Sequence, residues 1–219
     1  MSTKMKISGE DLEGVLGGNE LLEKGIHPDY TGKVVAVIGG GNVAMDTART
    51  IKRKGAKRVI VIYRRAEKQI PAEGKEVEEA KKEQIEFLFQ NNIVRILGNN
   101  EKKVTQVECI RTELKRKVGE DREVPVNIKD SNYFLPVDYV VMAVGSQTEK
   151  PLVESLGLEM TERGYIQVNE KYQASHSKVF AGGDLAGMKA TVAWAARSGR
   201  EAAKAMEQIL TEQEITIRN

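Results

Sequence analysis

The sequence of 219 residues predicts an α/β fold, with a parallel β-sheet and an antiparallel β-hairpin excursion. Continuous apolar runs at 33–38, 58–63 and 139–144 are typical of strands buried on both faces of a parallel sheet. Between the first two runs, apolar residues near helical spacing at 42–54 predict a helix. Strand, helix and strand within about thirty residues make a βαβ unit, whose crossover should be right-handed.

The rest of the chain carries weaker patterns. Residues 1–32 are polar and glycine-rich, without a strong period, and predict a lead-in or linker with a short helix near 19–24. The other expected elements, in chain order, are a solvent-facing helix at 72–84, strands at 86–90 and 93–97, a half-exposed antiparallel strand at 104–117 with its hairpin partners in 123–138, short strands at 165–168 and 178–181, and a long helix at 191–210.

Composition argues against several classes of partner. The chain has 34 basic and 32 acidic residues and a net charge of +2, which gives no electrostatic argument for nucleic acid or an anionic membrane. A single cysteine, Cys109, excludes an intramolecular disulfide and fits a reducing cytoplasm. No signal-peptide core opens the sequence, and no apolar run approaches the roughly 20 residues of a membrane span. We therefore expect a cytoplasmic protein with no nucleic-acid and no membrane partner.

A glycine-rich turn follows the first buried strand and fits the pattern G-x-G-x-x-A. Gly39 permits the tight turn, Gly41 lets a pyrophosphate approach the backbone, and Ala44 lets the helix pack closely. The helix N-terminus then offers unpaired N–H groups and the positive end of its dipole. Strand, turn, helix and second strand together predict a dinucleotide site, although a turn that binds no dinucleotide is the alternative. The expected contacts are Gly39, Gly40, Gly41, Asn42, Val43 and Ala44.

Two arginines, Arg64 and Arg65, end the second buried strand. A site for NAD or FAD usually has a carboxylate there, which accepts from the ribose 2′-OH, and Glu67 comes slightly late. Guanidinium groups can instead hold a 2′-phosphate in a bidentate fork. The pair therefore favours NADP(H) over NAD(H), with a solvated loop charge as the alternative role for one of them.

Near the C-terminus, the apolar stretch at 178–181 ends in Gly-Gly-Asp, and a helix rich in small residues follows. Asp184, beside Gly183, can accept a hydrogen bond from a ligand hydroxyl. The start of the helix, at Thr191 and Val192, can stabilise negative charge on a bound ring. The alternative is that Asp184 only caps a turn.

Taken in order, these motifs resemble the C-terminal half of the small subunit of NADPH-dependent glutamate synthase. They are similar more widely to the two-dinucleotide-binding flavoproteins, which are pyridine nucleotide-disulfide oxidoreductase-like. The motifs are GEDLEGV at 9–15, VAVIGGGNVAMDTART at 35–50, IYRR at 62–65, IPA at 70–72, VVMAVGSQ at 140–147 and VFAGGDLAGMKATVAWAARSGREAA at 179–203.

The resemblance implies three parts: a lead-in from the FAD domain at 1–32, an NADP(H)-binding Rossmann domain at 33–147, and a C-terminal segment of the FAD domain at 148–219. It implies hydride transfer from the nicotinamide to flavin N5, with electrons passed on through iron–sulfur clusters to a partner subunit. It also implies a role for each candidate residue. Gly39 to Ala44 would bind the NADPH pyrophosphate, Arg64 and Arg65 would bind the 2′-phosphate, and the chain would cross between the domains at Ala143, Val144 and Gly145. Asp184 with Gly183 would bind the FAD ribityl or phosphate region, and Thr191 and Val192 would lie at the flavin N1–C2 edge.

The chain also departs from this pattern. No second glycine motif precedes residue 39, and one cysteine cannot ligate iron–sulfur clusters. We therefore interpret the chain as truncated or as a split gene product, with no iron–sulfur cluster, no metal site and no catalytic residue of its own, and FAD only in a full-length context. The expected partner is the missing N-terminal FAD and iron–sulfur half or a large glutamate synthase subunit, with a homodimer also possible. Alternatives are a ferredoxin:NADP oxidoreductase-type subunit or a non-catalytic nucleotide-binding module.

Overall fold

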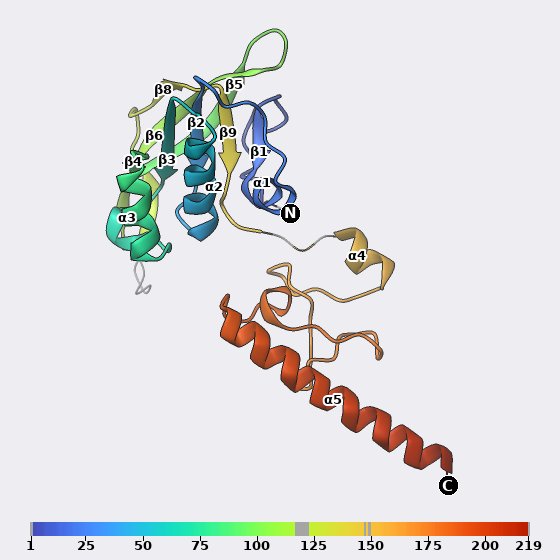
Figure 1. The fold of residues 1–219 in the computed structure, drawn as a ribbon. Helices are drawn as coiled ribbons and strands as arrows, with labels where there is room; N and C mark the ends of the chain where they lie inside the picture. Colours follow the sequence, from blue (N-terminus) through green and yellow to red (C-terminus); the bar gives the residue numbers. More distant parts are fainter. Residues whose placement is uncertain (1, 117–122, 147, 149, 219) are drawn as a thin grey trace. The chain divides into compact units, whose positions relative to one another are not determined.

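The computed structural model describes residues 2–116, 123–146, 148 and 150–218, and side chains as far as residue 211. The chain divides into two compact units, residues 1–146 and residues 147–219 (Figure 1). The first unit holds a parallel sheet and an antiparallel sheet, which confirms the predicted α/β class. The last residues of two predicted segments, 117 and 147, lie outside the described residues.

A five-stranded parallel sheet with the order β1-β9-β2-β3-β4 forms the centre of the first unit. Ala36 of the central strand lies between Ile60 on one side and Val140 on the other. Both neighbours are fully buried, as the continuous apolar runs predict. The strands are β1 (Val15–Gly17), β2 (Val34–Ile38), β3 (Arg58–Tyr63), β4 (Glu86–Phe89) and β9 (Tyr139–Met142).

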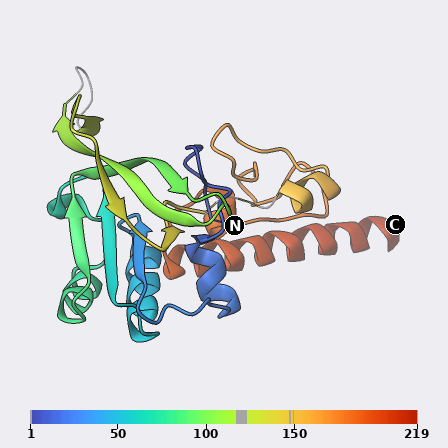
Figure 2. The ribbon, with the colours of Figure 1, turned by 90° about the horizontal axis from the view of Figure 1, so that it is seen from above.

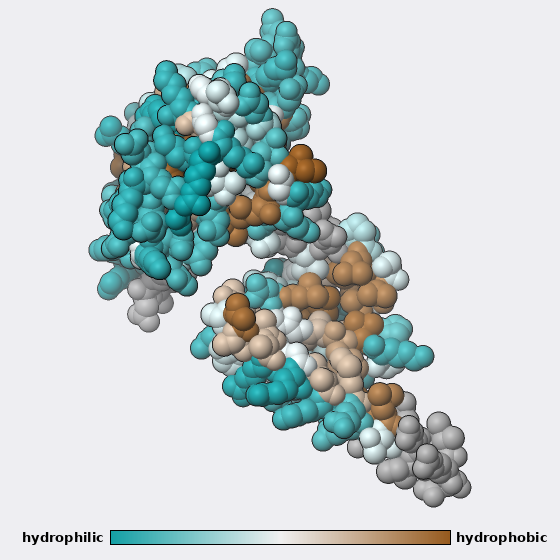
Figure 3. Space-filling model, viewed as in Figure 1, coloured by the Kyte–Doolittle hydropathy of each residue, from teal (hydrophilic) through white to brown (hydrophobic). Residues whose placement is uncertain are grey.

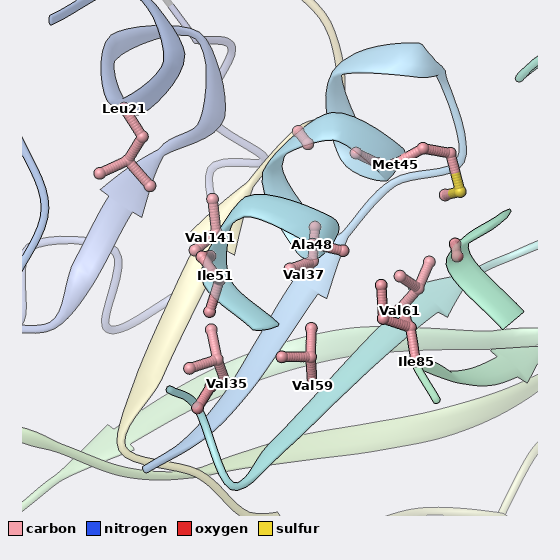
Figure 4. Close-up of a cluster of buried hydrophobic side chains, with 14 of the residues drawn as sticks. Leu21, Val35, Val37, Met45, Ala48, Ile51, Val59, Val61, Ile85 and Val141 are labelled. Carbon is pink, nitrogen blue, oxygen red and sulfur yellow. The ribbon is translucent and has the colours of Figure 1, made fainter. Parts of the chain in front are cut away.

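Helices cover one face of this sheet. Alternate residues of β2 and β3, among them Val35 and Val59, pack against Ala48 and Ile51 of the central helix (Figure 4). Small alanines on the helix let it lie close to the strands, so this face forms a continuous buried core. The helices of the unit are α1 (Gly18–Lys24), α2 (Asn42–Arg53), the 3-10 turn η1 (Glu67–Gln69) and α3 (Gly74–Lys82).

The antiparallel excursion covers the other face. The intervening residues of β2 and β3, such as Ala36 and Ile60, pack against Ile93 and Val107 of the excursion. Figure 2 shows its strands on the side of the sheet away from α2 and α3. Its long strand β6 (Val104–Lys115) pairs on one edge with β5 and on the other with β7 and β8, as predicted for a hairpin excursion. These partners are β5 (Asn91–Gly98), β7 (Val124–Asn127) and β8 (Tyr133–Pro136).

The predicted linker at 1–32 is part of the first unit. Its strand β1 pairs in parallel with β9, with Val15 opposite Val140. Tyr30, near the end of the segment, is fully buried. A strand of three residues shows no alternation in sequence, which is why the pattern did not reveal it. The short helix near 19–24 is present as α1. The origin of this segment in an FAD domain stays a prediction.

The second unit is less regular. It contains α4 (Lys150–Ser155), the 3-10 turn η2 (Gly183–Ala186) and the long helix α5 (Val192–Arg218) around a small core. The strands predicted at 165–168 and 178–181 are wrong, because these segments form only isolated bridges such as Met160 with Ile166. Bridges of one residue pair cannot propagate a ladder.

Apolar side chains remain exposed on the second unit. Val192 is 88% exposed, and Leu152 and Leu210 are also exposed. Figure 3 shows apolar residues gathered over this unit. No helix in the described part of the chain has both the length and the apolar character to cross a membrane.

Candidate functional site

Three loops meet at the carboxyl edge of the parallel sheet. Gly39 to Gly41 follow β2, Arg64 and Arg65 follow β3, and Ala143 to Gly145 follow β9. Because β9, β2 and β3 are adjacent and parallel, their carboxyl ends lie side by side. The chain leaves β2 toward β3 and β4, while β9 lies on the other side, so the strand order reverses here. Such a reversal creates the crevice in which α/β sheets bind ligands.

The glycine turn is shaped by its neighbours. Gly39 has φ 138°, and a Cβ on it would stand 2.2 Å from the carbonyl oxygen of Ala143. A Cβ on Gly40 would stand 2.7 Å from the ring of Tyr63. By contrast, a Cβ on Gly41 would meet nothing within 4 Å. Two of the glycines are therefore needed for packing, while the third leaves open space over the turn.

The amino end of α2 is open as well. Gly41 is the N-cap residue, no side chain caps the helix, and its first turn holds no acidic residue. The amides of Ala44 and Met45 donate to the carbonyl of Gly41. Among the described residues, no acceptor pairs with the amides of Gly41, Asn42 or Val43. Unpaired amides at the positive end of a helix dipole are suited to an anion.

The side chain of Asn42 has a role that sequence reasoning missed. Its Oδ1 atom accepts a hydrogen bond from the amide of Glu73 at 3.0 Å, at the start of α3. The amide of Ala72 donates to the carbonyl of Gly40, also at 3.0 Å. The loop after β3 is thus tied to the glycine turn. An asparagine at the first helical position was the only sequence signal for this link.

The arginine pair lies at the end of β3, with Arg64 exposed and Arg65 half-buried. Neither guanidinium forms an ion pair with another described residue. The next carboxylate along the chain, that of Glu67, pairs with Lys81 of α3. The backbone of the pair is held from the excursion, since Thr112 Oγ1 donates to the carbonyl of Arg64 at 2.8 Å. Sequence reasoning also missed this contact.

Ion pairs join the two helices beside the site. Arg49 of α2 lies 2.5 Å from Glu76 and 2.9 Å from Glu83, both on or next to α3. The Arg53 guanidinium, which donates to the same carboxylate, holds the pKa of Glu83 below its ordinary value. This network fixes α3, and with it the loop that contacts the glycine turn.

The segment that follows β9 is contacted by residues near the start of the chain. Ala143 donates its amide to the carbonyl of Ile38 at 2.8 Å, beside the glycine turn. Val144 is exposed, and Gly145, with φ 124°, accepts from the amide of Thr3 at 2.9 Å. The three residues predicted as a crossing therefore stand at the end of the first unit, which closes at Ser146.

The remaining predicted residues belong to the second unit. Gly183 donates its amide to Ser198 Oγ at 2.9 Å, so the Gly-Gly-Asp turn lies against the first turns of α5. Asp184 is exposed, and its carboxylate accepts no hydrogen bond from another described residue. The hydroxyl of Thr191 accepts from the amide of Trp194 at 3.3 Å and so caps α5, next to the exposed Val192.

Comparison with known proteins identifies a family, and the matching relatives align with most of this chain. Residues 2–218 match the family model "Pyridine nucleotide-disulphide oxidoreductase". The NADP(+)-dependent formate dehydrogenase subunit beta of Moorella thermoacetica is 35% identical over 215 residues, which are 95% of this chain and 30% of that protein. The NADPH glutamate synthase small chain of Halomonas elongata is 35% identical over 211 residues, 89% of this chain and 44% of that protein. The chain thus spans less than half the length of either relative.

A solved structure agrees in fold. The structure of Mycobacterium tuberculosis FprA in complex with NADPH has a TM-score of 0.80 and covers 99% of this chain and 63% of its own. The two sequences are 19% identical, so this likeness concerns the fold alone.

Proposed function

Since this chain belongs to the pyridine nucleotide-disulphide oxidoreductase family, we propose that its first unit binds NADPH. The family match covers residues 2–218 and confirms the resemblance seen in the motifs. In this proposal the chain is the NADPH-binding part of a flavin-dependent oxidoreductase of the glutamate synthase small-subunit type.

The observation that carries the proposal is the open space over Gly41 beside unpaired helix amides. A pyrophosphate fits there because the amides of Asn42 and Val43 can donate to it at the positive end of α2. A bulky side chain at position 41 would fill the same space. The residues at this turn therefore supply both the space and the hydrogen-bond donors that a dinucleotide needs.

The arginine pair supports the choice of NADPH over NADH. Arg64 and Arg65 stand at the end of the strand next to the glycine turn, where the adenosine ribose lies in this type of fold. Their guanidiniums suit a 2′-phosphate. Glu67, the next carboxylate along the chain, pairs with Lys81 and is not free to accept from a 2′-hydroxyl.

Bound nicotinamide supplies a hydride, and the chain's own residues bind and orient the nucleotide that carries it. Gly41 to Val43 anchor the pyrophosphate, and the arginine pair anchors the adenosine end. We assign no acid or base among these residues, because the chemistry belongs to the cofactors.

The flavin part of the proposal concerns a longer protein. Asp184 can accept from a flavin hydroxyl, and Thr191 and Val192 begin a helix that can stabilise charge on the flavin ring. The described residues of the second unit hold no glycine-rich strand, turn and helix to cradle the FAD pyrophosphate. FAD would therefore need the rest of an FAD domain, which is also our proposed partner, together with a large subunit and its iron–sulfur clusters.

Two other assignments follow from the same site. A ferredoxin:NADP oxidoreductase-type subunit would use the nucleotide in the same way. A non-catalytic nucleotide-binding module is favoured by one observation: the nucleotide site lies within the first unit, whereas the flavin site would be only partial. The exposed apolar side chains of the second unit, such as Val192, support contact with a further chain, including a second copy of this one. We also propose a cytoplasmic location, which the single cysteine supports.

The test is a calorimetric titration of the purified chain with NADPH, NADH and FAD. We expect NADPH to bind more tightly than NADH by about tenfold or more, since each charged hydrogen bond contributes about 1.5–3 kcal/mol. Arg64→Ala with Arg65→Ala should erase this preference. The matched control, Lys54→Ala with Lys57→Ala, removes two exposed charges at the opposite edge of the sheet and should leave it intact. Equal affinity of the unaltered chain for the two nicotinamides would contradict the proposal.

A further inference from the structure

Thr112, on the long strand β6 of the excursion, contacts the backbone of the arginine pair. It is 3% exposed, and its hydroxyl donates to the carbonyl of Arg64 at 2.8 Å. Its own amide donates to the carbonyl of Gln90 at 2.8 Å, and the amide of Gln90 donates to the carbonyl of Arg65 at 2.9 Å. Both arginine carbonyls are thus bound, directly or through one residue, to the same point on β6.

The ladder of β6 with β5 ends at this point, with Arg111 opposite Asn91. On the other edge of β6 the ladder with β7 begins, with Thr112 opposite Asn127. The pairing of β3 with β4 ends one residue before the arginines, at Tyr63 and Phe89. The carbonyl of Arg64 therefore lies beyond the parallel ladder, and the Thr112 side chain satisfies it in place of a strand amide.

We propose that Thr112 is a positioning residue for nucleotide selectivity. It fixes the backbone of Arg64 and Arg65, from which two guanidiniums without an ion-pair partner among the described residues extend at the carboxyl edge of the sheet. This inference rests on the proposed binding of NADPH. It also gives the antiparallel excursion a function, because the excursion supports the part of the site that recognises the 2′-phosphate.

The physical reason is entropic. An arginine side chain loses much rotamer freedom when it binds a phosphate, and a mobile backbone adds to that loss. A backbone held by a buried hydrogen bond has already lost its freedom before the nucleotide arrives. Removal of the Thr112 hydroxyl should therefore weaken binding of the 2′-phosphate and leave the contacts at the glycine turn unchanged.

The experiment compares three variants by calorimetry with NADPH and NADH. Thr112→Val replaces the hydroxyl by a methyl group and keeps the strand amide, and we expect it to raise the Kd for NADPH about tenfold and the Kd for NADH less than about twofold. Thr112→Ser returns the hydroxyl and should restore most of the preference. Thr105→Val is the control, because its hydroxyl lies on the same strand, is exposed and donates to Leu97 instead.

A thermal melt of each variant reports on folding separately. Should Thr112→Val not fold, Thr112→Ala removes the same hydroxyl without a second methyl against the Arg64 carbonyl, and it must give the same loss of preference. A folded variant that keeps the NADPH preference, or one that loses both nucleotides in equal proportion, overturns the inference alone. An unaltered chain without any preference overturns the proposed function and this inference together.

Discussion

The backbones of Gly39 and Ala143 touch: a Cβ carbon on the glycine would stand 2.2 Å from the alanine carbonyl oxygen. The amide of Ala143 in turn donates to the carbonyl of Ile38 at 2.8 Å. The glycine turn is therefore fixed by the end of β9, more than a hundred residues away in the chain. The residues that shape the turn and those that bind a ligand can be separated by substitution.

Alanine at Gly39 should reduce mainly stability, whereas alanine at Gly41 should reduce mainly nucleotide affinity. Gly39→Ala places a Cβ against the β9 backbone at φ 138°, and we expect it to lower the free energy of unfolding by about 2 kcal/mol or more. Gly41→Ala has open space and an ordinary φ of −86°, so it should cost about 1 kcal/mol or less. Its Cβ would nevertheless stand where the pyrophosphate approaches, and NADPH affinity should fall more than about tenfold.

Urea unfolding of each variant, together with calorimetry of the folded ones, checks this pair. A Gly39→Ala chain as stable as the unaltered one would show that the backbone at the end of β9 can shift at little cost in free energy. A Gly41→Ala chain with full NADPH affinity would mean that the ligand does not lie over the turn.

Local patterns predicted the elements whose signals are local. The strands on either side of α2 and the helix itself agree with their predicted ranges to within one residue, because continuous apolar runs and helical spacing are visible in any window of that length. β1 was not predicted, since its three residues gain their structure only from pairing with β9. The strands expected at 165–168 and 178–181 do not form, because their β-like sequences find no strand to pair with beyond isolated bridges.

The residues of the candidate site divide in the same way, into those with a local sequence signal and those without one. The glycine motif and the arginine pair could be read from sequence, because their chemistry depends on residue type and spacing. The hydrogen bond of Thr112 to Arg64 joins residues 48 positions apart, and that of Asn42 to Glu73 joins residues 31 apart. No short-range pattern encodes such contacts. Sequence thus predicts which groups meet a ligand, and only the folded chain shows which residues hold those groups in place.

In the second unit, Ser198 should be a main determinant of stability. It is 1% exposed, accepts from the buried amide of Gly183 at 2.9 Å and donates to the carbonyl of Ala195. Ser198→Ala leaves that amide without an acceptor, which costs about 1–3 kcal/mol. Trp194 is the only tryptophan and lies in this unit, so its fluorescence during urea unfolding reports on this unit alone.

The control is Ser155→Ala, which removes an exposed hydroxyl in the same unit and should change the midpoint little. Identical fluorescence midpoints for Ser198→Ala and the unaltered chain would refute the role of this hydrogen bond.

Cys109 should make the first unit less stable at alkaline pH. Its side chain is fully buried in the core between the two sheets, and burial raises the pKa of the thiol to about 11. In the unfolded chain the thiol titrates near its ordinary value of about 8.5. The folded state therefore holds a proton that the unfolded state releases, so stability is complete below that value and falls as pH rises toward 11.

Between about pH 9 and pH 10 this single group should lower the free energy of unfolding by up to about 1.4 kcal/mol per pH unit. The window stops there because Tyr30 and Tyr133, whose pKa values burial raises to about 12, begin to contribute above the ordinary tyrosine value. Cys109→Ala lowers stability at every pH, since it leaves a cavity, but it lacks the titrating thiol. Urea unfolding across this range should thus give a steeper loss of the free energy of unfolding with pH for the unaltered chain than for the variant.

Equal slopes of the free energy of unfolding against pH would mean that the thiolate is tolerated in the folded core. Rapid reaction of the native thiol with a thiol reagent at pH 8.5 would mean that the core opens.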